Sequence, residues 1–269
     1  MLRAISTILL GGFLFDTSLP LAGAIVSSPL FDKPLHETHT QLPLDPDNPQ
    51  SKPVLSCFYY PGFMVKQVDL GDMGAEQLSI LPRAKGSAEP QCLRANAKDE
   101  IVIGPKEWGG YFEGVKGSFV FFHAEDGFYG GLDFGVFSAD GRKLFEDLAS
   151  LDKSGIAFTT LAMLSDPKNE TDPAIILRYR RVYAAQCSLR ADEKACWSEI
   201  RKITGLPQTA PPSCTAAYEA EKKRLPEYAN KVDSYPSVIT YEVEVVLNER
   251  NPVMRVAPVS KTTECYLGD

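Results

Sequence analysis

An alternating segment near the C-terminus constrains the fold more than any other feature of this sequence. Between Val238 and Leu247 the apolar side chains Ile239, Tyr241, Val243, Val245 and Leu247 share one face of an extended chain, and Thr240, Glu242 and Glu244 lie on the other. This period of two predicts a β-strand with one buried face. A turn at Asn248–Pro252 and an apolar segment at Val253–Val259 predict that the next strand pairs back as a hairpin.

Further strands of the same kind lie upstream. Residues 174–185 alternate in the same way, and residues 117–146 alternate strand-like runs with glycine-containing turns, which is typical of an antiparallel meander. Within it, Phe119–Phe122 is apolar on both faces and predicts a strand covered on both sides. Shorter strands are expected at Ser56–Tyr60 and Phe63–Leu70.

Two short helices are expected between these strands. The first has Asp192 as its N-cap, Cys196 and Ile200 at helical spacing and Gly205 as its stop. Ser213 or Thr215 can cap the second, and Pro226 ends it or begins a further turn. We therefore predict an α+β fold, mainly antiparallel β-sheet of meander or sandwich-like form, with a short disulfide-clamped helical insertion at about residues 190–232.

Six cysteines support this picture of a clamped sheet. They are Cys57, Cys92, Cys187, Cys196, Cys214 and Cys265. An even number without any C-x-x-C motif favours structural disulfides over a zinc ribbon or a redox site. Proximity in sequence favours the pairs 57–92, 187–196 and 214–265, and the rival set joins 196 to 214 and 187 to 265.

The N-terminus resembles a secretory signal peptide. One positive charge at Arg3 precedes an apolar run from Ala4 to Phe15, and the small residues Ala22 and Ala24 form a cleavage site. The run is too short to span a bilayer, and no later stretch is long enough to do so. We expect cleavage near Ala24 and a soluble mature protein in the periplasm or outside the cell.

Residues 25–53 are rich in proline and predict a flexible tether between this signal peptide (residues 1–24) and a single mainly-β domain (residues 54–269). His36 and His39 lie in this segment. Two imidazoles on a mobile strand make a poor metal site, because zinc sites need three or four ordered ligands. The sequence therefore predicts no metal centre there.

Several functions are disfavoured by composition and by missing motifs. A net charge of −7 argues against a nucleic-acid partner, which needs basic side chains at phosphates. Nucleotide-binding glycine loops, G-x-S-x-G elbows and H-E-x-x-H motifs are absent from the sequence. The predicted domain contains one histidine, His123, for which a hydrogen bond near a turn is a simpler role than catalysis. We predict no cofactor and no catalytic residue.

Two glycine-rich aromatic loops are the candidate binding site. Residues 107–114 contain Trp108 and Tyr111, and residues 125–133 contain Phe128 and Tyr129. If both loops reach one end of the sheet, the four rings form a platform for a sugar or a peptide, with Asp126 and Asp133 as polar anchors. The competing interpretation is that the glycines make tight turns and the rings pack on the rim of the core.

Carboxylates in the second loop also allow an enzymatic hypothesis. Two of the three acids Glu125, Asp126 and Asp133 could serve as the opposed carboxyl groups of a glycoside hydrolase. The same acids suit calcium, although the EF-hand pattern is absent.

Three arginines, Arg178, Arg180 and Arg181, form the densest basic run. They are expected either to receive an anionic partner or, for the first two, to pair with Glu242 and Glu244 on a neighbouring strand. Asn169 begins a glycosylation sequon, which has meaning only in a eukaryotic secretory host.

The leading functional hypothesis is thus an exported, disulfide-stabilised protein that binds a glycan or a protein partner without catalysis. The alternative is a carboxylate-dependent hydrolase of cell-envelope polysaccharide.

Overall fold

The computed structural model describes residues 30–44, 46, 48–152, 155–164, 173–250, 253–259 and 262–267. The predicted signal peptide and the Asn169 sequon lie outside these residues. The described chain is mainly antiparallel β-sheet with a few short helices, which confirms the predicted fold class. No helix among the described residues is long and apolar enough to cross a membrane.

The N-terminal part forms a five-stranded antiparallel sheet in the order β1-β2-β3-β4-β5. Its strands are β1 (His36–Gln41), β2 (Val54–Tyr59), β3 (Phe63–Asp69), β4 (Gln77–Pro82) and β5 (Ile101–Ile103). Each strand pairs with the next one along the chain, so the sheet is a simple meander.

The remaining strands form a ten-stranded antiparallel sheet whose main path runs β14-β13-β12-β9-β8-β7-β6. The strands on this path are β6 (Gly110–Lys116), β7 (Phe119–Phe128), β8 (Gly131–Ser138), β9 (Lys143–Asp152), β12 (Ala174–Ala184), β13 (Val238–Asn248) and β14 (Val253–Pro258). Three short strands flank them, namely β10 (Gly155–Ile156) on β9, β11 (Phe158–Leu164) on β12 and β15 (Glu264–Tyr266) on β13. The predicted meander and hairpin are both part of this sheet.

The helical insertion lies between β12 and β13. It contains α1 (Glu193–Thr204), α2 (Thr215–Arg224), a 3₁₀ turn (Pro226–Tyr228) and α3 (Ala229–Val232). As predicted, the Asp192 side chain caps α1 by accepting a hydrogen bond from the Ala195 N–H, and Gly205 ends the helix in the left-handed conformation. The predicted cap of α2 was wrong, because Cys214 occupies that position and makes no side-chain cap bond.

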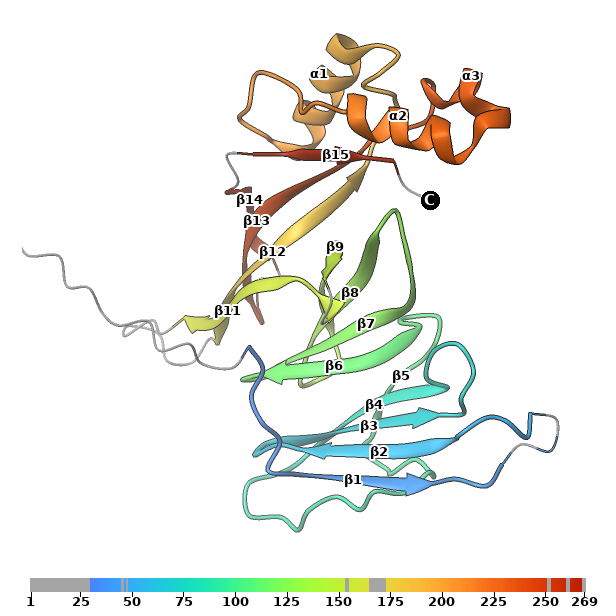
Figure 1. Ribbon diagram of the computed structural model, residues 1–269. Helices are drawn as coiled ribbons and strands as arrows, with labels where there is room; N and C mark the ends of the chain where they lie inside the picture. Colours follow the sequence, from blue (N-terminus) through green and yellow to red (C-terminus); the bar gives the residue numbers. More distant parts are fainter. Residues whose placement is uncertain are drawn as a thin grey trace, which may run out of the picture.

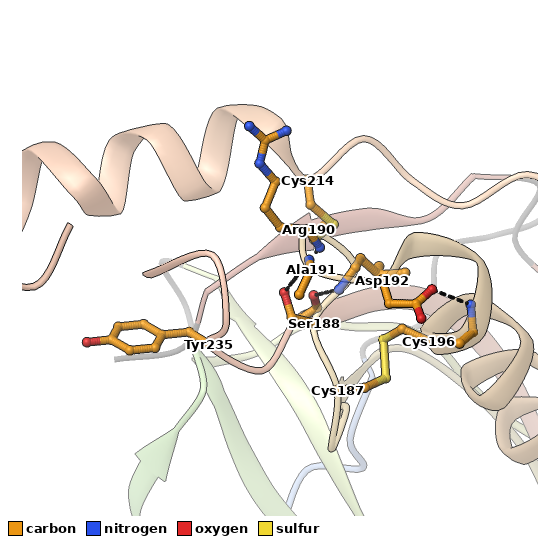
Figure 2. The surroundings of a disulfide bond; sticks show 12 residues. Cys187, Ser188, Arg190, Ala191, Asp192, Cys196, Cys214 and Tyr235 are labelled. Atoms are coloured by element: carbon orange, nitrogen blue, oxygen red, sulfur yellow. Dashed lines mark hydrogen bonds between the residues drawn. A yellow bond between two sulfur atoms is a disulfide. The ribbon is translucent and has the colours of Figure 1, made fainter. Parts of the chain in front are cut away.

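All three favoured disulfides are present, between Cys57 and Cys92, Cys187 and Cys196, and Cys214 and Cys265. The rival pairing is thereby excluded. The second bond joins the segment just after β12 to α1 (Figure 2), and the third joins the start of α2 to β15. Together they tie the insertion to the large sheet, as the sequence predicted.

The two sheets pack against each other in Figure 1, with β6 and β7 above the small sheet. A shared hydrophobic cluster joins Phe63, Val65 and Ile80 of the small sheet to Val120 and Phe122 of β7. A larger cluster on the opposite side of the ten-stranded sheet extends to the helices. The smallest cluster surrounds the Cys57–Cys92 disulfide on the outer face of the small sheet.

The prediction that ordered structure begins only near Val54 was wrong. Residues 36–41 form β1, which pairs along its whole length with β2, so part of the predicted tether is an edge strand. The strand is polar because it is exposed on its outer side, which removes the apolar alternation that would have revealed it. Its histidines are partnered, His36 stacking on Tyr59 and His39 contacting the Ser56 hydroxyl at 2.9 Å.

A segment before β1 connects the two sheets, and we call residues 30–35 the strap. The Asp32 N–H donates to the carbonyl of Val115 in β6, and the Leu35 N–H donates to the carbonyl of Tyr59 in β2. The Phe31 ring packs edge-on against Phe121, with ring centroids 5.3 Å apart. The strap is therefore part of the packed structure rather than a free tether.

Candidate binding site

The hairpin between β7 and β8 presents two of the predicted aromatic residues at its end. Phe128 closes β7 and Tyr129 follows it in the turn, and these side chains are 48% and 37% exposed. Their rings meet edge to face with centroids 5.4 Å apart and an angle of 73° between the planes. We call Phe128 and Tyr129 the aromatic tip.

The backbone at the aromatic tip has an unusual conformation. Tyr129 has a φ of +52° and Gly130 has a φ of +70°. Two successive residues with positive φ are typical of a type I′ hairpin turn, which normally uses Asn-Gly or Gly-Gly. A bulky side chain in this region is rare and costs roughly 1–2 kcal/mol. Tyr129 is the one residue other than glycine with positive φ in the described chain.

A contact from β15 fixes this turn. The Tyr266 hydroxyl donates a 2.6 Å hydrogen bond to the Tyr129 carbonyl. A side chain at position 130 would crowd the Tyr266 ring, since a Cβ on Gly130 would lie 3.2 Å from it. Tyr266 follows Cys265, whose disulfide to Cys214 anchors β15 to α2. The tip is thus held in place by a covalently anchored strand.

The structure places the other two predicted rings elsewhere. Trp108 is only 6% exposed, packs in the cluster between the sheets and donates from Nε1 to the His123 carbonyl at 3.2 Å. The Tyr111 hydroxyl accepts from the Gly74 N–H and donates to the Asp72 carbonyl. Because both residues hold the inter-sheet junction, they do not form a common platform with the aromatic tip.

The predicted acidic anchors have local roles. Asp126 accepts a hydrogen bond from the Gly127 N–H and so stabilises its own turn. Residues 124–126 form a bulge in β7, since His123 pairs with Phe134 while Gly127 already pairs with Leu132. Asp133, opposite this bulge, is half-buried. Burial, together with the charges of Glu146 and Asp147, raises the pKa of Asp133.

The carboxylates that act on Asp133 are those of Glu146 and Asp147 in β9. Glu146 is engaged by Lys143 at 2.8 Å. Among the described residues, no group of three or more histidine, cysteine or acidic side chains is arranged to hold a metal ion.

His123 lies inside β7 and its ring contacts the Ala124 carbonyl through Nδ1 at 2.9 Å. Its other nitrogen faces Glu113 at 3.6 Å. Burial raises the pKa of Glu113, and the nearby His123 opposes this rise. The pair lies beside Tyr111 at the inter-sheet junction. The histidine is hydrogen-bonded, as expected from the sequence, but it lies within β7 and not near a turn.

The arginine run follows the predicted cross-strand pattern in part. Arg178 lies opposite Glu244 and Arg180 lies opposite Glu242, as expected for neighbouring strands. Arg178 pairs with Glu244 at 2.6 Å, but Arg180 turns to Glu264 of β15 at 3.0 Å. The third arginine, Arg181, makes a buried ion pair that the sequence did not predict.

Arg181 pairs with the buried carboxylate of Asp147 at 2.9 Å, and the Tyr179 hydroxyl donates to the same carboxylate. Burial raises the pKa of Asp147, although both partners favour its ionised form. The alternation of β12 shows that Tyr179 and Arg181 share a face, but nothing in the sequence predicts that β9 brings Asp147 to them. This network lies against the main core and has a structural role.

Comparison with known proteins gives no relative. No family model matches the chain, and neither a curated protein nor a solved structure resembles it significantly.

Proposed function

We propose that this chain is exported, loses its signal peptide after Ala24 and acts by binding a protein partner through the aromatic tip, without catalysis. Three disulfides support an oxidising compartment, because such bonds persist mainly outside the cytosol. The observation that carries the binding role is Tyr129, whose ring is exposed on a backbone conformation that disfavours it.

The strained backbone of Tyr129 supports a binding role for its side chain. Glycine or asparagine at position 129 would close the same turn at lower cost. Tyrosine there adds an exposed ring beside Phe128 and gains little burial in exchange. Strained residues of this kind concentrate at functional sites, where the surrounding structure holds them in place. Here Tyr266 supplies that support.

The shape of the tip favours a protein over a glycan. Sugars stack on a flat aromatic face, but the rings of Phe128 and Tyr129 stand 73° apart and form no common plane. All residues from Glu125 to Gly130 are exposed, so both rings of the tip lie at the surface, where a partner can reach them. Protruding aromatic side chains act as anchors that fill pockets on a partner protein.

The experiment compares capture by matched variants of the mature, oxidised protein. Wild type, Phe128→Ser/Tyr129→Gly and the control Tyr228→Ser are immobilised and exposed to the exported fraction of the source cells. Tyr228 serves as the control because it is 47% exposed and belongs to the 3₁₀ turn of the helical insertion and not to the β7–β8 hairpin. We expect a partner that wild type and the control retain and that the tip variant loses.

Binding of the purified partner is then measured by calorimetry. Loss of two aromatic anchors is expected to weaken binding at least ~30-fold, since one such anchor is worth about 2 kcal/mol or more. Equal binding by all three proteins would refute the proposal. Tip-dependent binding on a glycan array would instead assign the tip to carbohydrate, and hydrolysis of envelope polysaccharide that Asp133→Asn abolishes would favour the enzymatic alternative.

A further inference from the structure

A cavity of about 420 Å³ lies between α1 and the segment that follows it. Its main lining residues are Lys194, Trp197, Ser198, Arg201, Thr209 and Pro211. This volume falls within the range typical of small-molecule sites. The cavity belongs to the helical insertion, so it is independent of the aromatic tip.

The walls of the cavity are tied together. Trp197 donates from Nε1 to the Thr209 carbonyl at 3.1 Å, and Arg201 donates from Nε to the Leu206 carbonyl at 3.3 Å. The Cys187–Cys196 disulfide fixes the first half of α1 to the segment just after β12, as Figure 2 shows. Prolines 207, 211 and 212 restrict the backbone of the opposite wall. The cavity is therefore preformed.

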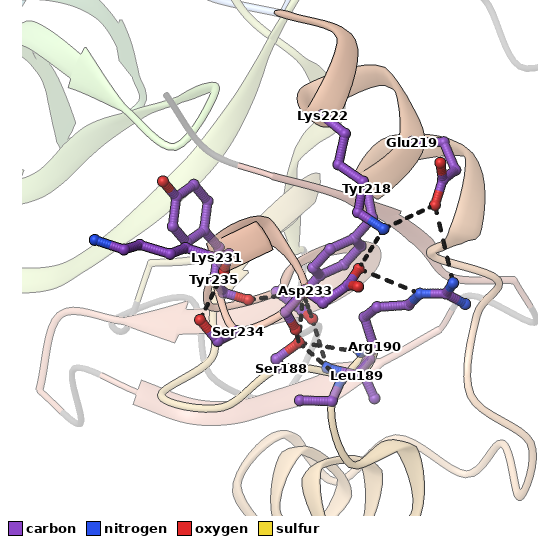
Figure 3. A network of polar contacts seen from close by, with 12 residues as sticks. Ser188, Leu189, Arg190, Tyr218, Glu219, Lys222, Lys231, Asp233, Ser234 and Tyr235 are labelled. Carbon is purple, nitrogen blue, oxygen red and sulfur yellow. Dashed lines mark hydrogen bonds and ion pairs between the residues drawn. The ribbon is translucent and has the colours of Figure 1, made fainter. Parts of the chain in front are cut away.

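Ion pairs outside the cavity fix the placement of α1 and α2. Figure 3 shows a network in which Asp233 accepts ion pairs from Arg190 and Lys222, at 3.4 and 2.9 Å. Glu219 contacts the same two cations. Since Arg190 precedes α1 and Lys222 belongs to α2, this network holds the two helices in one arrangement. Arg190 does not line the cavity, whose positive charges are those of Lys194 and Arg201.

The charged side chains of the lining favour an anionic ligand. Lys194, Ser198 and Arg201 follow each other at four- and three-residue spacing and so share one face of the helix. Lys194 has no hydrogen bond or ion pair within the described part of the chain. The Arg201 bond to Leu206 uses Nε, so the terminal nitrogens remain to contact a ligand. With Glu193 as the only acid in the lining, the cavity carries two positive charges and one negative charge, a net +1 in a chain of −7.

We infer that this cavity binds a small organic anion in which a carboxylate or phosphate group is attached to a compact body. The anionic group would pair with Lys194 and the terminal nitrogens of Arg201, and the hydroxyl of Ser198 lies on the same helix face. Trp197 and Pro211 supply the apolar part of the lining for the body of the ligand.

The test uses matched pairs of charged and neutral probes. Calorimetry of the mature, oxidised protein at low salt compares glucuronate with glucose and glycerol 3-phosphate with glycerol. We expect at least one anion to bind at least ~10-fold tighter than its neutral counterpart and to lose affinity as salt is added. The cavity assignment fails if neither anion binds, or if each binds no better than its neutral counterpart.

Three variants locate the binding. Lys194→Gln removes the unpaired cation, and Arg201→Gln removes the second one. Lys202→Gln is the control, because Lys202 is an exposed cation of the same helix that does not line the cavity. Affinity should fall at least fivefold in each of the first two variants and remain unchanged in the third. Equal losses in all three would show general charge attraction and overturn the site. None of these outcomes depends on the tip variants, so the two proposals fail or succeed separately.

Discussion

At the scale of single residues, buried charge is the feature that the sequence conceals best. Lys66 and Glu100 form an ion pair of 2.5 Å in which each side chain is 1% exposed. Lys66 also donates to the Leu93 carbonyl at 3.2 Å. The pair holds the long loop between β4 and β5 against the small sheet. A lysine within an apolar strand gives no sign of its partner, because that partner is 34 residues away in the chain.

Glu100→Gln is expected to lower the free energy of unfolding by about 3 kcal/mol, because it leaves the Lys66 ammonium buried without a counter-charge. The measurement is urea unfolding at neutral pH. Glu76→Gln is the control, since Glu76 is half exposed and its contact with Arg94 is 3.5 Å long. A change within about 0.5 kcal/mol is expected for the control. Equal effects of the two substitutions would contradict a stabilising role for the buried pair.

The same pair predicts a pH dependence. Burial opposes the ionisation of Glu100, but hydrogen bonds from Lys66, Ser79 and the Ala97 N–H outweigh it and hold the pKa of Glu100 below its usual range. A lowered pKa in the folded state stabilises the protein above the unfolded value of about 4.3. That contribution is lost as the pH falls through the folded value. Stability below about pH 4 should therefore decline more steeply in wild type than in Glu100→Gln.

Tyr129 allows a second prediction at this scale. Tyr129→Gly removes a bulky side chain from a left-handed conformation, so the free energy of unfolding should stay the same or rise by about 1 kcal/mol. Tyr266→Phe, which deletes the hydroxyl that fixes the turn, should lower it by about 1 kcal/mol. Thermal unfolding of both variants checks this. A marked destabilisation by Tyr129→Gly would show that the ring is structural.

At the scale of elements, sequence patterns identify those strands that bury one or both faces. The large sheet was predictable from β7, β12 and β13 because their apolar residues alternate or run continuously. Strand β1 could not be predicted, since its residues are exposed and it forms a strand only through pairing with β2. The glycines beside Phe128 and Tyr129 predict an aromatic turn from local sequence alone, whereas the burial of Trp108 could not be predicted in this way. Only the packing of the second sheet places that ring between the layers.

The disulfides are expected to differ in how much they stabilise the protein. In the chain-entropy model, the bond across 51 residues stabilises by about 4 kcal/mol and the bond across 9 residues by about 2.6 kcal/mol. Replacing Cys214 and Cys265 by alanine should therefore cost more stability than replacing Cys187 and Cys196. The first change should also weaken tip-dependent binding, because β15 carries Tyr266. Chemical unfolding and partner binding of the two double variants are the measurements. The reverse order of stability would show that loop length does not set the contribution of these bonds.

At the scale of the whole molecule, the strap joins the two sheets. Asp32 and Leu35 bond to different sheets, and Phe31 occupies the space above Gly114, where a Cβ would come within 2.5 Å of its ring. The two layers are thus connected by backbone hydrogen bonds and a ring contact as well as by the shared cluster. A sequence rich in prolines predicted a free segment here, because proline indicates irregular backbone but not what that backbone touches.

Phe31→Ala should lower the free energy of unfolding by about 2 kcal/mol, as expected for a half-buried aromatic ring. Leu35→Ala, at an exposed position of the same strap, should change it by less than about 0.5 kcal/mol. Gly114→Ala should destabilise wild type but have little effect in the Phe31→Ala background, where the space above residue 114 is empty. Chemical unfolding of the single and double variants is the measurement. Additive effects of the two substitutions would show that the ring and Gly114 do not interact.

The most direct test of the central claim places a photo-crosslinking amino acid at position 128 in the oxidised mature protein. The same group at position 228 serves as the control. Illumination in the exported fraction of the source cells should give one discrete protein adduct from position 128 and none of that mass from position 228. Absence of the adduct at position 128, or the same adduct from both positions, would contradict the claim that the aromatic tip is the binding surface.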